Sequence, residues 1–220
     1  MSNDVLAPQA HAYHRASDLP EEVRRALLQH EAAANVILPF VKKVSKSPGD
    51  DEHLWIALYD EKHNVEFVLS CTKGPLGDYP IFIVACKSSA QLADDEMRGK
   101  DLADSLSPLV LCLLENVPPK RVFSVFSIAK VAEKFAEIFV AQTHQEHGVQ
   151  AHEDPYYDAT FTFCTRETLN ESQDLTFPLR ESEDIVVALR RADMSHLNGI
   201  KTMCKDFAET SVGTVDVVRI

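Results

Sequence analysis

The densest group of candidate metal ligands lies in residues 144–154, HQEHGVQAHED. His144 and His147 stand three positions apart, so both can share one face of a helix, and imidazole with carboxylate is a ligand set that suits zinc. The order H-E-x-x-H of a metalloprotease helix is absent here. The alternative is a solvated helix end, where histidine interacts favourably with the helix dipole. We predict no metal at this segment.

The nucleophilic side chains follow no catalytic motif. The five cysteines are odd in number and widely spaced, without a C-x-x-C pair, so we expect small buried hydrophobes rather than a disulfide framework. No G-x-S-x-G elbow and no phosphate-binding glycine motif occurs, and seven glycines in 220 residues leave little material for such loops. Nucleotide-dependent chemistry is therefore disfavoured, and no catalytic residue is assigned.

The charge of the chain excludes several classes of partner. There are 34 acidic and 22 basic side chains, a formal net charge of −12. Such a chain repels phosphate backbones and anionic lipid, so we predict neither nucleic-acid nor membrane binding. The first thirty residues contain no apolar signal region, and no run of about 18 apolar residues follows. We expect a cytoplasmic setting.

Periodicity in the first part of the chain predicts helices followed by strands. Apolar residues recur at spacings of three and four over residues 23–41, and Asp18 with Glu21 is a helix-start signal. Pro39 leaves open one kinked helix or two short ones. Three strand-like runs then predict an antiparallel meander: residues 53–59, 65–71 and 80–86.

The second part alternates helices and strands. Helical spacing from residue 102 ends at Pro118-Pro119, and a strand, a helix and a further strand are expected at residues 121–127, 128–143 and 157–165. The order predicts an α/β fold: a mixed, mostly antiparallel sheet with helices on both faces. We expect this domain to span residues 20–168, between a flexible arm and a linker (residues 1–19 and 169–188), and a further amphipathic helix at residues 192–210, capped by Asp193 or Ser195.

This order and several segments resemble the GNAT superfamily of acyl-CoA N-acyltransferases, in particular fungal two-domain GNAT-like proteins. The second copy in such proteins normally continues well past the length available here, so the resemblance implies that residues 189–220 begin a second, incomplete GNAT-like domain. The segments that carry it are ANVILPFVKK (34–43), LWIALYD (54–60), VEFVLSCTKGPLGDY (65–79), VPPKRVFSVFS (117–127), PYYDATFTFCTR (155–166) and LRRADMSHLNGIKTMCKDFAETSV (189–212).

The resemblance implies acetyl-CoA as co-substrate, held in a cleft where two parallel central strands splay apart. Here that pair would be residues 80–86 and 121–127, with the loop 87–101 as pyrophosphate cradle. That loop lacks the family's Q/R-x-x-G-x-G/A pattern, and its only glycine is Gly99. Ser127 could instead be a simple helix cap. The candidate cofactor-binding residues are Ile83, Val84, Cys86, Lys87, Ser88, Ser89 and Ser127.

The resemblance further implies transfer of an acetyl group to an amine on a small molecule or peptide. In this superfamily a tyrosine on the helix after the fifth strand often reprotonates the thiolate, but the matching helix offers Phe135 and Phe139. Tyr156 and Tyr157 are either substitutes or packing residues. The alternative hypothesis is a non-catalytic GNAT-like scaffold or partner-binding module with a degenerate acetyl-CoA site. On either hypothesis the apolar face of the C-terminal helix has no completed domain to bury it, so we expect this helix to pack on the first domain, to drive association as a homodimer or docking contact, or to be mobile.

Overall fold

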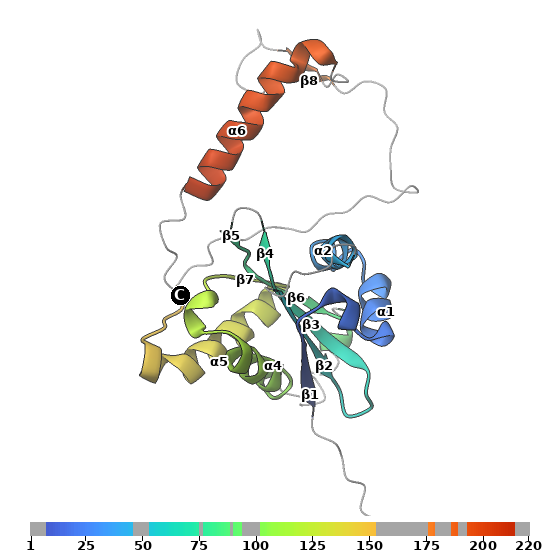
Figure 1. The fold of residues 1–220 in the computed structure, drawn as a ribbon, viewed down its shortest axis with the longest axis vertical. Coiled ribbons are helices and arrows are strands. Elements are labelled where there is room, and N and C mark those ends of the chain that lie inside the picture. Colours follow the sequence, from blue (N-terminus) through green and yellow to red (C-terminus); the bar gives the residue numbers. More distant parts are fainter. Residues whose placement is uncertain are drawn as a thin grey trace, which may run out of the picture. The chain divides into compact units, whose positions relative to one another are not determined.

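A five-stranded sheet in the order β1-β2-β3-β6-β7 organises the first part of the chain (Figure 1). Neighbours from β1 to β6 are antiparallel, and β6 and β7 are parallel. The predicted α/β class, with a mixed and mostly antiparallel sheet, is confirmed, as is the meander. The strands are β1 Gln9–Tyr13, β2 Leu54–Tyr59, β3 Val65–Cys71, β6 Ile81–Ala85 and β7 Val125–Phe126, with a small hairpin of β4 Lys73–Gly74 and β5 Gly77–Asp78.

The computed structural model describes residues 8–45, 53–74, 77–88, 90–93, 102–152, 176–178, 186–188 and 193–213. The chain divides into two units, Met1–Tyr156 with Val218–Ile220, and Tyr157–Val217. The predicted strand at residues 157–165 lies outside the described residues. None of the helices in the described ranges is both long and apolar enough to cross a membrane.

Helices cover both faces of the sheet, because the central strands are apolar on both sides. In β2, Leu54, Ile56 and Leu58 belong to one core cluster, and Trp55 and Ala57 belong to another. The first cluster includes α4 Leu102–Asn116 and α5 Ala129–His147. The second includes α1 Glu21–Gln29 and α2 Ile37–Val44 (Figure 1).

Two short helices, rather than one kinked helix, form the first helical face. Pro39 does not cause the break: it is the third residue of α2, where its missing N–H would have no helical partner anyway. The predicted start at Asp18 is wrong, because Asp18 ends a 3-10 helix, Ala16–Asp18, and Pro20 precedes α1.

The strand expected at residues 121–127 is much shorter than predicted. Only Val125–Phe126 pairs with β6, while Pro119–Arg121 forms a 3-10 helix. The backbone N–H of Arg121 donates to the Pro118 carbonyl at 2.9 Å, so this N–H is not available for pairing with a neighbouring strand. The helix after this strand begins as predicted and extends to His147.

The expectation of a flexible arm over residues 1–19 is corrected for its middle part. Residues 9–13 form β1, which pairs antiparallel with β2 from Gln9↔Tyr59 to Tyr13↔Trp55. Ala10 and Ala12 face the same core as α4 and α5. The apolar edge of β2, rather than a strong local pattern, recruits this segment into the sheet.

The second unit contains a two-stranded hairpin and a helix. The strands β8 Thr176–Pro178 and β9 Val186–Ala188 pair antiparallel, within a stretch expected to be a linker. A 3-10 turn, Met194–His196, precedes α6 Leu197–Gly213, which corresponds to the predicted helix. Asp193 caps the turn, since its Oδ1 accepts from the Ser195 N–H at 2.8 Å.

Deletion of residues 1–13 tests the role of β1. Because the deletion removes an edge strand and its apolar contacts, we expect the free energy of unfolding to fall by about 2–4 kcal/mol. Deletion of residues 1–7 alone should change it by less than about 0.5 kcal/mol. Urea unfolding measures both free energies. Equally small effects of the two deletions would mean that residues 9–13 do not stabilise the sheet, as expected for a flexible arm.

Candidate functional site

The only parallel pair within the described sheet, β6 and β7, is joined over two residue pairs, Ile81↔Val125 and Phe82↔Phe126. The rings of Phe82 and Phe126 stack with centroids 5.5 Å apart. Beyond this point a side chain replaces the ladder: Ser127 Oγ donates to the Ile83 carbonyl at 2.9 Å. The candidate residues Ile83 and Ser127 are therefore brought together, 44 positions apart in sequence.

The backbone of β6 turns a donor and an acceptor towards the β7 side after the ladder ends. The Ile81 N–H donates to the Ser124 carbonyl at 2.9 Å on that side, and the Cys86 N–H donates to the Glu66 carbonyl at 2.8 Å on the β3 side. Because backbone groups alternate along a strand, the N–H and C=O of Ala85 face the β7 side. An extended amide-containing ligand could pair with them there.

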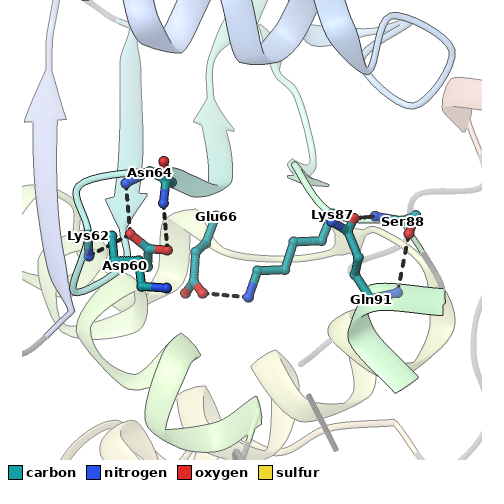
Figure 2. Close-up of polar contacts among 7 residues, drawn as sticks. All are labelled: Asp60, Lys62, Asn64, Glu66, Lys87, Ser88 and Gln91. Carbon is teal, nitrogen blue, oxygen red and sulfur yellow. Dashed lines mark hydrogen bonds and ion pairs between the residues drawn. The ribbon is translucent and has the colours of Figure 1, made fainter. Parts of the chain in front are cut away.

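Lys87, expected to face an anionic ligand, is held by a buried carboxylate instead (Figure 2). Its Nζ lies 2.5 Å from Oε1 of Glu66, whose side chain is 1% exposed. The pairing offsets the cost of burying the carboxylate. Glu66 was missed by the sequence reasoning, although a charged residue inside the apolar strand VEFVLSC was a signal of an internal partner.

A tight turn between β2 and β3 precedes Glu66 (Figure 2). Asp60 Oδ1 accepts from the N–H groups of Lys62 and Asn64, at 2.8 and 2.7 Å, and the Asn64 side-chain amide donates to Oδ2 at 3.1 Å. His63 adopts φ of 60° there. Such Asx hydrogen bonds fix the turn and hence the register of β3.

Ser88 forms a reciprocal cap with Gln91 (Figure 2). The Ser88 N–H donates to Gln91 Oε1 at 2.7 Å, and the Gln91 N–H donates to Ser88 Oγ at 3.2 Å. This is a capping box, and it begins a helical turn at residues 90–93. Ser89 and most of the remaining predicted cradle, residues 94–101, lie outside the described residues.

The side chains of the other candidate residues, in β6 and directly after it, are buried or partly buried in the fold. Ile83 is buried in the core beside α4 and α5, and Val84 is buried in the core beside α1 and α2. Cys86 is partly buried, and this burial raises the pKa of its thiol to about 12. The thiol is therefore a neutral group at physiological pH, not a nucleophilic thiolate.

The histidines singled out in the sequence lie at the end of α5. His144 Nδ1 is 2.9 Å from the Val149 carbonyl, and His147 Nε2 is 3.8 Å from a Glu146 carboxylate oxygen. In the part of the chain that the structure describes, no three His, Cys, Asp or Glu side chains gather as a metal site. Phe135 and Phe139 are buried on the same helix, with their rings stacked 6.1 Å apart.

No family model, no curated protein and no solved structure matches this chain.

The Glu66–Lys87 pair gives the first test of this site. Lys87→Met removes the cation that pairs with the buried Glu66 carboxylate, so we expect a loss of about 3–5 kcal/mol in the free energy of unfolding. The double variant Glu66→Met with Lys87→Met removes both charges and should recover most of that loss. Urea unfolding of the single and double variants measures the coupling, and strictly additive losses would contradict a buried ion pair.

Cysteine alkylation tests the environment of Cys86. Its pKa rises from 9.0 to about 12 on folding, so the folded state keeps the thiol protonated and slow to react. Exposed Cys204 should be modified by iodoacetamide first at pH 8.5, as followed by peptide mass spectrometry. The stability that the raised pKa contributes is fully present below pH 9.0 and is lost as the pH rises towards about 12. Equal alkylation rates at Cys86 and Cys204 would refute this environment.

Proposed function

We propose that this chain is an N-acetyltransferase of the GNAT type, which binds acetyl-CoA at the end of β6 and acetylates an amine. The observation that carries the proposal is the parallel β6–β7 ladder, which ends after two residue pairs and leaves the Ala85 backbone facing the β7 side. A pantetheine arm contains amide groups that can pair with such a strand as an additional strand would.

The proposed reaction is acyl transfer. The acceptor amine attacks the thioester carbonyl, a C–N bond forms, the C–S bond breaks, and the thiolate of CoA takes up the proton that the amine releases. No residue is assigned to either proton transfer. The net charge of −12 favours a cationic amine as acceptor.

The pyrophosphate of the cofactor would lie near Lys87, Ser88 and Ser89. Lys87 is already paired with Glu66 at 2.5 Å, so its charge is largely neutralised within the fold. Binding would then depend on backbone N–H groups and serine hydroxyls more than on a free cation. We expect a weaker affinity for acetyl-CoA than in a site where an unpaired cation faces the pyrophosphate.

A non-catalytic GNAT-like module is the second candidate function. Phe135 and Phe139 are buried on α5 and carry no hydroxyl, so the helix that follows β7 provides no tyrosine among its core residues. The absence of a tyrosine among these core residues favours a scaffold that binds acetyl-CoA without turning it over. The two candidates differ in CoA release with amine acceptors.

Thermal unfolding with and without millimolar acetyl-CoA tests the proposal. A ligand at about 100 times its Kd adds about 2.7 kcal/mol, which should raise Tm by about 5–10 °C for a domain of this size. CoA should give a comparable shift and ATP should give none. No shift with acetyl-CoA and CoA would contradict the acetyl-CoA site; a shift without CoA release from a panel of amines would favour the non-catalytic module.

A charge inserted at the end of β6 tests the position of the pyrophosphate. Ser88→Glu places a carboxylate beside the proposed anion site and should weaken acetyl-CoA binding at least about tenfold through like-charge repulsion. Gln29→Glu adds the same charge at the exposed end of α1 and is the matched control. Isothermal titration calorimetry measures both affinities, and equal affinities would argue against this placement.

A further inference from the structure

A pocket separate from the proposed acetyl-CoA site lies at the opposite end of the sheet, where β2 begins, β3 ends and the chain enters β6. Its volume is about 550 Å³, within the range of small-molecule sites. Residues from the start of β2, the β4–β5 hairpin, the end of α4 and the 3-10 helix Pro119–Arg121 line it. It contains none of the residues proposed above for acetyl-CoA.

The charge of the lining is opposite to that of the chain. Three basic side chains, Lys73, Lys120 and Arg121, line the pocket, and Asp78 is the single carboxylate among its described lining residues. Two histidines, His14 and His53, add further nitrogen atoms. Among the described lining residues this leaves an excess of two positive charges, which in a chain whose net charge is −12 favours an anion at this site.

The guanidinium of Arg121 is held in a fixed position within this lining. Its two terminal nitrogens donate to the carbonyls of Tyr79 and Thr72, at 2.9 and 2.6 Å, and Nε lies 3.4 Å from Asp78 Oδ2. The side chain is 13% exposed. Two of the three contacts are with neutral carbonyls, so they orient the guanidinium without removing its charge, which is the preorganisation that anion binding requires.

The remaining walls indicate the size and character of the ligand. Leu54, Val117 and Pro118 provide apolar surface beside the cations. Lys120 and Lys73 are both exposed, and the Lys120 ammonium group can reach a ligand from the rim. A phosphate group carries a charge of about −1.5 to −2 at pH 7, which matches the local excess, whereas a single carboxylate carries only −1.

We propose that this pocket binds a small organic phosphate monoester, with the phosphate between Arg121, Lys120 and Lys73 and the organic part against the apolar walls. This site is independent of the acetyl-CoA proposal because the two lie at opposite ends of β6 and share no residue. Either proposal, phosphate binding in this pocket or acetyl-CoA binding at the end of β6, can therefore be refuted while the other stands.

Titration with phenyl phosphate, followed in amide ¹H–¹⁵N spectra, tests the site. We expect saturable shifts at Lys73, Asp78, Lys120 and Arg121, with smaller shifts from inorganic phosphate and none from phenol. Lys120→Gln removes an exposed cation without breaking a core contact and should weaken phenyl phosphate binding about 5- to 20-fold. The matched control Lys62→Gln removes an exposed cation from the β2–β3 turn and should leave the Kd unchanged.

Three results would overturn the proposal. The first is the absence of a saturable shift at these amides when phenyl phosphate is added up to about 0.2 M at constant ionic strength. The second is equal weakening by Lys120→Gln and Lys62→Gln, which would indicate general charge attraction. The third is saturable binding whose shifts lie at Cys86–Ser88 and not at this pocket.

Discussion

Burial of both faces of the central strands is the constraint on which the rest of this structure depends. Every residue of β2 is buried, so the strand needs a helical layer on each side. The segment after β6 provides one of those layers, because it forms α4. When a chain crosses the face of a sheet in one helix and then rejoins the sheet, the new strand runs parallel to the strand it left. The parallel pairing of β6 with β7 follows from this crossover, and the two strands part after two residue pairs.

Arg121 anchors the chain just before that ladder begins. Its guanidinium binds the carbonyls of Thr72 and Tyr79, which flank the small β4–β5 hairpin, and so anchors the 3-10 helix before β7 against the end of β3. The backbone leaves the 3-10 turn with only Val125–Phe126 left to pair. One side chain thus anchors the chain at the start of the parallel ladder and supplies a fixed cation to the pocket at the same, amino end of β6.

Periodicity in the sequence was sufficient for the meander and for the helices that became α4 and α5, because long apolar faces at regular spacing depend little on distant residues. It was insufficient for β1, whose residues QAHAY contain no β-branched side chain and enter the sheet because the edge of β2 is apolar. At the candidate site, Lys87, Ile83 and Ser127 were named, but Glu66 was not, and neither was the hydrogen bond from Ser127 to the Ile83 carbonyl. Glu66 lies 21 positions from Lys87, and Ile83 lies 44 positions from Ser127, beyond the reach of any local pattern.

The two ends of β6 differ in how they could hold a phosphate-bearing ligand. At the carboxyl end, the charge of Lys87 is neutralised by Glu66 inside the fold, so among the described residues there backbone N–H groups and the Ser88 hydroxyl remain to attract an anion. At the amino end, Arg121 is oriented mainly by neutral carbonyls, and its charge adds to that of two neighbouring lysines. Binding at the amino end should therefore depend strongly on salt, while binding along the β6 backbone should not, because screening acts on charges and hardly on strand-like amide pairing.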